Sequence, residues 1–123
     1  MALTRALSEL STLFSLLAHP LRLRFVEELA VAERSVGDLA ETTHVAQAIA
    51  SQQLILLKAQ RVITQRRDGR HVFYRLNRPQ LAEWVAQGLN FIDVDTDDVS
   101  HVSRSIRQAR KEWTKRIKPR RPQ

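Results

Sequence analysis

Four basic side chains surround an Asp-Gly pair in the stretch QRRDGRHVFYRL, which runs from Gln65 to Leu76. A guanidinium group is planar and presents several N–H donors in a fixed geometry that matches phosphate and carboxylate oxygens. The pattern therefore indicates a surface that binds anions, and a basic hairpin that is only solvated is the alternative. The four side chains are Arg66, Arg67, Arg70 and His71.

A second set of polar side chains precedes this stretch at helical spacing. If Ala50, Leu54 and Leu57 face a core, a period of about 3.6 residues sends a different set outward. Glutamine amides donate and accept hydrogen bonds at the same time, so this outward face can recognise a ligand that offers both acceptors and donors. Plain solvation of an exposed helix is the alternative. The outward set is Gln47, Ala48, Ser51, Gln52 and Ile55.

Hydrophobic periodicity predicts a mainly helical chain that positions both groups. Ser35 and Asp38 resemble a capping box, while Thr42, Thr43 and His44 form a break with N-cap candidates for the next helix. Two strands, at 62–67 and 70–76, should form a hairpin that turns at Asp68-Gly69. Helices are expected at about residues 4–18, 20–31, 35–41, 46–59 and 79–89, and a last helix is expected from a cap at Asp95 or Thr96 through Ile117.

Composition limits the class of protein. The 123-residue chain has a net charge of +7, and nine of its 20 Lys and Arg residues lie in 104–121. Cysteine is absent, which excludes disulfides, thiolate metal sites and cysteine nucleophiles. No apolar run is long enough to span a bilayer and no secretory signal is recognisable, so a soluble, cytoplasmic protein is expected. The length favours one compact domain, residues 1–92, followed by an acidic linker, a C-terminal helix and a basic tail at 93–123.

The order helix, helix, short helix, turn, helix, charged hairpin, helix is that of a winged helix-turn-helix, an α+β fold. LAHPLRLRFVEELA resembles the second helix of the ArsR (ArsR/SmtB-like) family of bacterial repressors. SVGDLAETTHVAQAIASQQLILLKAQRVI is similar to that family's helix-turn-helix, and RRDGRHVFYRL to its wing. The resemblance covers residues 17–76, about half of the chain.

This resemblance implies a regulator that binds double-stranded DNA, with the helix at 46–59 in the major groove and the wing at 62–76 beside it. Gln47, Ala48, Ser51 and Gln52 are then expected to read base edges, because amides pair with adenine and small side chains allow close approach. The wing cations Arg66, Arg67, Arg70 and His71, together with Thr43 and His44, are expected to contact the backbone.

A homodimer is also implied, and two apolar stripes favour it independently. One stripe lies on the first helix and the other on the last, at spacings of three and four residues suited to a partner helix. Packing of either stripe within the chain is the alternative. The expected interface residues are Leu3, Leu7, Leu10, Phe14, Val99, Val102, Ile106 and Trp113.

Neither a cofactor nor a metal is expected. Family positions that hold metal-binding cysteines match Ser35 and Gly37 here, and Asp97, Asp98 and His101 are too few ligands for a zinc site. An effector, if one exists, is unidentified. The absence of a phosphate loop or a catalytic constellation argues against an enzyme. The alternatives to a repressor are an architectural nucleic-acid-binding protein with weak sequence preference, or a winged-helix module that binds proteins.

Overall fold

The computed structural model describes residues 1–92 and 101–117. The chain divides into two compact units, Met1–Arg78 and Pro79–Gln123. The expected domain boundary after residue 92 stays a prediction. None of the helices in the described ranges is both long enough and apolar enough to cross a membrane.

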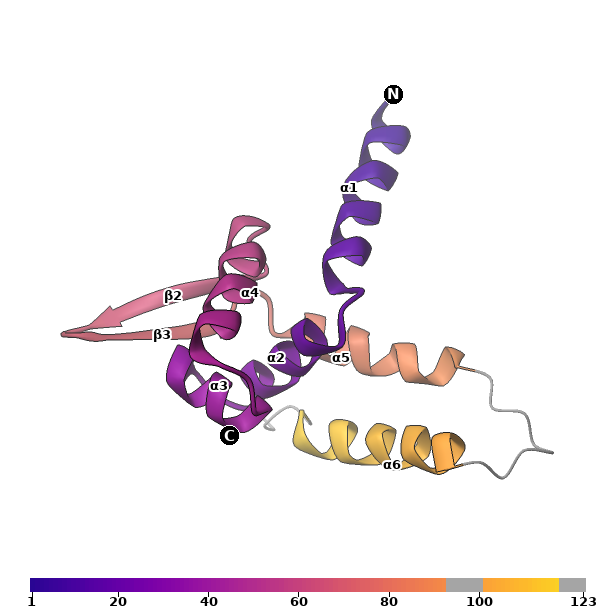
Figure 1. Cartoon of the computed structure of the whole chain (residues 1–123). Coiled ribbons are helices and arrows are strands. Elements are labelled where there is room, and N and C mark those ends of the chain that lie inside the picture. Colours follow the sequence, from indigo (N-terminus) through magenta and orange to yellow (C-terminus); the bar gives the residue numbers. More distant parts are fainter. Residues whose placement is uncertain (93–100, 118–123) are drawn as a thin grey trace, which may run out of the picture. The chain divides into compact units, whose positions relative to one another are not determined.

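The first unit is a helix-turn-helix with a small sheet (Figure 1). The sheet has the order β1 (Arg34–Ser35), β3 (His71–Leu76) and β2 (Ile63–Asp68), and both strand pairs are antiparallel. The predicted helices and hairpin are confirmed. Strand β1 was not predicted, because two residues are too few to show a period. The elements are α1 (Ala2–Leu17), α2 (Pro20–Val31), β1 (Arg34–Ser35), α3 (Val36–Thr43), α4 (Gln47–Ala59), β2 (Ile63–Asp68) and β3 (His71–Leu76).

Local side-chain hydrogen bonds cap the N-termini of α2 and α3. The Leu21 amide donates to His19 Nδ1 at 3.2 Å, and Pro20 occupies the first turn, where its missing N–H costs nothing. Ser35 and Asp38 form the predicted capping box: the Asp38 amide donates to Ser35 Oγ and the Ser35 amide to Asp38 Oδ2, each at 3.1 Å. Two of the donors that a helix start leaves unpaired are thereby satisfied.

The core of the first unit gathers side chains from α2, α3, α4 and β2. Because α4 contributes Ala50, Leu54 and Leu57, all 1% exposed or less, one side of this helix is fixed inward. The largest fully buried side chains are Phe25, Val26, Leu39, Leu54, Leu57 and Ile63.

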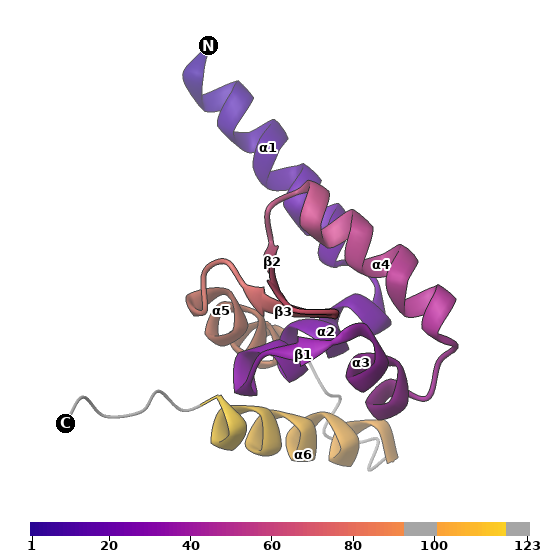
Figure 2. The same ribbon diagram turned by 90° about the vertical axis from the view of Figure 1, so that its left-hand side faces the viewer.

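The connection between α3 and α4 differs from the prediction (Figure 2). Thr42 and Thr43 do not form a break but belong to the last turn of α3. His44 adopts a left-handed conformation, with φ of 58°, and the following Val45 amide donates to the Ala40 carbonyl at 3.1 Å. This hydrogen bond caps the C-terminus of α3. His44 therefore ends one helix and does not cap the next, which follows Ala46 without a side-chain cap.

The hairpin turn lies one residue later than predicted. Asp68 pairs with His71, so the two central residues are Gly69 and Arg70 and not Asp68 and Gly69. Gly69 has φ of +61°. A hairpin turn with a positive φ at its first central position favours glycine there, and this preference sets the register.

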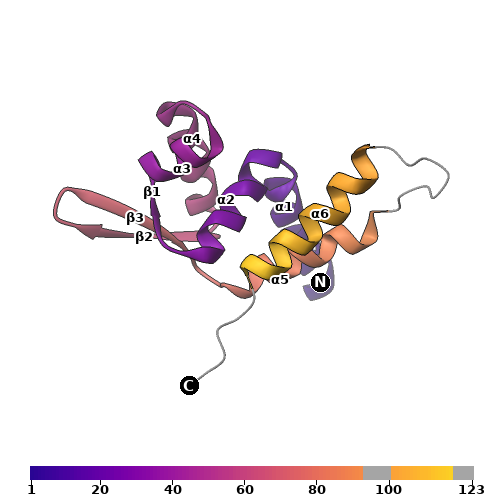
Figure 3. The same cartoon turned by 90° about the horizontal axis from the view of Figure 1, so that it is seen from below.

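The second unit contains α5 (Gln80–Gly88), the 3₁₀ turn η1 (Leu89–Phe91) and α6 (His101–Arg116). Helices α5 and α6 lie side by side (Figure 3). Arg110 of α6 is half-buried, and its Nη2 donates to the Leu89 carbonyl at 2.9 Å. The neighbouring Ala109 is exposed. A carbonyl at the end of α5 thus draws the arginine inward.

Candidate nucleic-acid interface

The outward face of α4 carries the predicted side chains. Gln47, Ala48, Gln52 and Ile55 are exposed, and Ser51 is half-buried. The face follows directly from the inward placement of Ala50, Leu54 and Leu57. Hydrogen-bonding amides and a small side chain are therefore presented to solvent on one rigid helix.

Gln53, on the same helix, has a different role that the sequence did not indicate. Its Oε1 accepts a hydrogen bond from Arg22 Nε at 2.7 Å, and Arg22 Nη1 donates to the Leu16 carbonyl at 2.9 Å. The guanidinium thus connects α4 to the end of α1. This contact fixes α4 against its neighbours and helps to hold its outward face in place.

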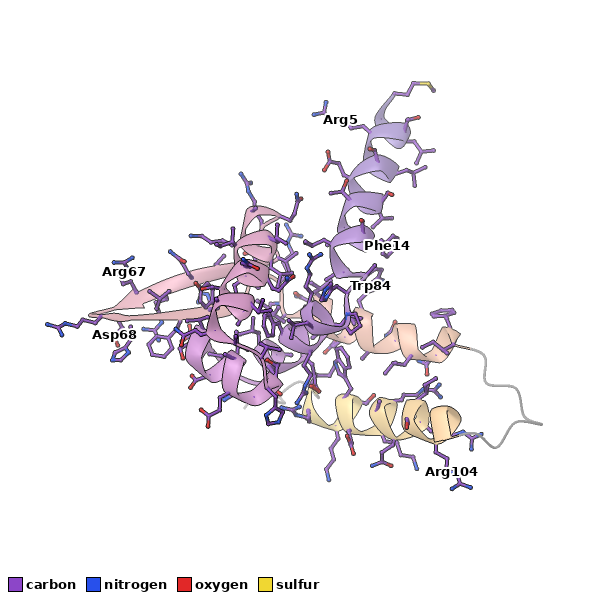
Figure 4. The ribbon with its side chains drawn as sticks, in the orientation of Figure 1. Arg5, Phe14, Arg67, Asp68, Trp84 and Arg104 are labelled. Atoms are coloured by element: carbon purple, nitrogen blue, oxygen red, sulfur yellow. The ribbon has the colours of Figure 1, made fainter. Side chains whose placement is uncertain are left out.

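Strand alternation separates the two arginines of β2. Arg66 pairs with Phe73 and Arg67 with Val72 across the hairpin, so their side chains leave opposite faces of the wing, the β2–β3 hairpin. Figure 4 labels Arg67 and Asp68, which also point to opposite sides of the wing. The four wing cations therefore do not form one cluster.

Glu33 binds Arg66 across the sheet. Arg66 Nη2 lies 2.8 Å from Glu33 Oε2, and Arg66 Nε lies 3.2 and 3.3 Å from the two carboxylate oxygens. The guanidinium also sits over the Phe73 ring, with Cζ 5.0 Å from the centroid. The hydrogen bond from Arg66 lowers the pKa of Glu33, and the same bond raises the pKa of Arg66.

This pairing distinguishes the wing cations from one another. Arg66 also lies 3.8 Å from Asp68, so two carboxylates face it. Within the described parts of the chain, Arg67 and Arg70 form no ion pair, and both are exposed. His71 is exposed, with its ring 6.2 Å from that of Phe73. The expected phosphate contacts of these four residues stay predictions.

Thr43 is the last residue of α3, and His44 follows it in the turn of the helix-turn-helix. The Thr43 hydroxyl donates to the Leu39 carbonyl at 2.6 Å, so its proton is used within α3. The His44 side chain is exposed. Their expected contacts with a DNA backbone also stay predictions.

The apolar stripe of α1 is exposed along its length. Leu3, Leu7, Leu10 and Phe14 are 70%, 55%, 41% and 47% exposed. On α6, Ile106 and Trp113 are half-buried. Val99 and the side chain of Val102 lie outside the described residues, as do Asp97 and Asp98. In the residues that the structure describes, no three potential metal ligands come together.

Known proteins share this arrangement. The family model described as "Bacterial regulatory protein, arsR family" matches residues 19–65. The HTH-type transcriptional repressor SmtB of Mycobacterium tuberculosis is 44% identical over 69 residues, which are 56% of this chain and 51% of that repressor. The chain thus spans about half the length of this relative.

Solved structures extend the similarity across the fold. The crystal structure of the transcriptional repressor BigR from Xylella fastidiosa is 32% identical, with a TM-score of 0.64 over 76% of this chain and 96% of that chain. The homodimeric winged helix-turn-helix DNA-binding domain Mb0332 from Mycobacterium bovis is 26% identical, with a TM-score of 0.61 over 75% of this chain and 92% of that chain.

The described fold is therefore a winged helix-turn-helix. The chain belongs to the arsR family of bacterial regulatory proteins. SmtB and BigR are transcriptional repressors by name, which agrees with the expectation that the chain is not an enzyme.

The Glu33–Arg66 pair predicts a titration that NMR can follow. Because the hydrogen bond from Arg66 stabilises the ionised carboxylate and so lowers the pKa of Glu33, the pairing is complete above the ordinary Glu value of 4.5 and is lost as the pH falls through the lower value. A side-chain ¹³C titration should place the Glu33 midpoint below 4.5, and Arg66→Met should raise it.

Arg67→Met is the matched control, because Arg67 leaves the other face of the wing. It should not move the Glu33 midpoint. If Arg67→Met raised the Glu33 pKa as much as Arg66→Met, the assignment of Arg66 as the partner of Glu33 would be wrong.

Proposed function

We propose that this chain is a sequence-specific regulator of transcription that binds double-stranded DNA as a homodimer and acts as a repressor. The observation that carries the proposal is the outward face of α4. Gln47, Ala48, Ser51 and Gln52 lie there on a helix whose other side is held in the core. In the major groove each base pair offers a distinct set of donors and acceptors, which amide side chains can read.

The wing supplies affinity in this proposal. Arg67 and Arg70 are exposed and without ion pairs in the described structure, which supports a role in neutralising phosphates. Phosphate contacts release condensed counterions and hold the protein in register, but they carry little sequence information. Base reading is therefore assigned to α4 and backbone binding to the wing.

The exposed stripe of α1 supports a homodimer. Four large apolar side chains on one side of a helix are unfavourable in water, and a second copy of the same helix would cover them. The similar domain Mb0332 is homodimeric. A dimer would place one α4 in each of two half-sites about one helical turn apart, which requires an inverted-repeat operator. Occupation of such a site within a promoter would exclude the polymerase.

Selection of bound sequences from a random duplex library tests the proposal. An inverted repeat should be enriched and bound at least about a thousandfold more tightly than scrambled DNA. Gln52→Ala should reduce this preference by about 1 to 3 kcal/mol, the usual worth of a good base contact. Gln60→Ala is the control and should leave this preference unchanged, because Gln60 is an exposed glutamine just beyond α4.

The same selection could also contradict the proposal. If no sequence were enriched and every duplex were bound with steep salt dependence, the chain would be an architectural protein. The exposed cations of α6 would then account for its affinity: Arg104, Arg107, Lys111, Lys115 and Arg116.

The dimer has its own test. Leu7→Glu should shift the chain toward monomer in sedimentation velocity and weaken operator binding, because it places a charge in the apolar stripe. Since Leu7 is 55% exposed, the substitution leaves the core of the unit intact. Ser8→Glu adds the same charge about 100° around α1 and should leave the dimer unchanged. A Leu7→Glu chain that still sedimented as a dimer would exclude α1 from the interface.

A further inference from the structure

Ile55 is an exposed apolar side chain in the middle of a polar helix face. It is 66% exposed, whereas Ile49 and Leu56, the other large apolar side chains on the surface of α4, are each 43% exposed. Leu56 borders a groove that α1 also lines, with Ser11, Thr12 and Ser15. Leu56 therefore faces an element of its own unit, and Ile55 does not line this groove.

The position of Ile55 continues the face proposed to read DNA. It comes seven residues after Ala48, which is about two turns of an α-helix, so both lie on one line along α4. Ser51 and Gln52 lie between them on the same side. The buried residues Ala50, Leu54 and Leu57 are on the other side. Known recognition helices present base-contacting residues over a span of similar length.

The chemistry of isoleucine restricts what it can contact there. It has no hydrogen-bonding group, so it can bind neither a phosphate nor a base-edge donor or acceptor. The apolar group on a base-pair edge in the major groove is the C5-methyl group of thymine. Isoleucine is also stiff at χ1 in a helix, so its methyl groups are held in one place before binding.

Helix stability does not explain the residue. Alanine, leucine, glutamate and lysine are all better helix formers than isoleucine at an exposed position. A single exposed isoleucine is ordinary on most of a protein surface. On the face assigned to the major groove, however, DNA binding would remove it from water beside the base edges.

We propose that Ile55 is a specificity-determining residue that contacts a thymine methyl group in each half-site of the operator. The inference rests on the proposed function and deepens it, since it assigns one kind of base pair to one side chain. Ala48 can touch a methyl group only where the helix approaches closely, whereas Ile55 reaches further from the helix axis.

Deoxyuridine substitution tests this contact directly. Deoxyuridine keeps every hydrogen-bonding group of thymidine and lacks only the C5-methyl group. Each thymine of the selected operator is replaced in turn, in both half-sites, and the affinity of the full chain is measured by fluorescence anisotropy. At one position the wild-type chain should bind about fourfold more weakly per half-site, the factor expected for one methyl-sized apolar contact.

Variants then assign the contact to Ile55. Ile55→Ala should weaken binding to the thymine operator by a similar factor and should no longer distinguish thymine from deoxyuridine at that position. Alanine favours the helix, and circular dichroism checks that α4 is retained. Ile55→Val keeps a branched side chain and should keep part of the discrimination. Ile49→Ala removes the same side chain elsewhere on α4 and should leave the discrimination intact.

The outcomes separate this inference from the proposed function. An enriched operator without a deoxyuridine-sensitive position, or with a sensitivity that Ile55→Ala leaves unchanged, would overturn the role of Ile55 alone. If no operator were enriched, the proposed function would fail and this inference would fail with it.

Discussion

Burial of one side of α4 is the constraint on which the rest of the proposed interface depends. Ala50, Leu54 and Leu57 are almost completely inaccessible to water, and α3 packs against the same helix. A rotation of α4 by one residue, about 100°, would expose apolar side chains and bury polar ones, which is costly in a close-packed core. The direction of Gln52 and Ile55 therefore follows from side chains that never touch a ligand.

Ion pairing within the chain distinguishes the basic side chains of the wing from one another. Arg66 and Arg67 are adjacent in sequence, yet the alternation of a strand sends them to opposite faces. Glu33 and Phe73 hold Arg66, while Arg67 forms no ion pair with any residue that the structure describes. The outward face of α4 is uncharged from Gln47 to Leu56. The charged groups and the groups proposed to read bases are thus carried by different elements, as the separate demands of phosphate and base recognition require.

Local patterns were enough to predict the helices, the hairpin, the capping box at Ser35 and the outward face of α4, because each depends on residues within a few positions of one another. What the sequence did not reveal depends on distant contacts or on backbone conformation. Glu33 and Arg66 are 33 positions apart and meet only through the β1–β3–β2 sheet. The turn register and the role of His44 depend on positive φ values at Gly69 and His44, which periodicity does not encode.

The most direct test of the division between α4 and the wing is the salt dependence of Arg67→Ala binding to operator and to scrambled DNA. Affinity for both duplexes should fall by the same factor. The salt slope should decrease by about one for each phosphate that the arginine no longer neutralises. The ratio between the two duplexes should remain as in the wild-type chain. A weakening confined to the operator would contradict the account, because it would show that the wing reads bases.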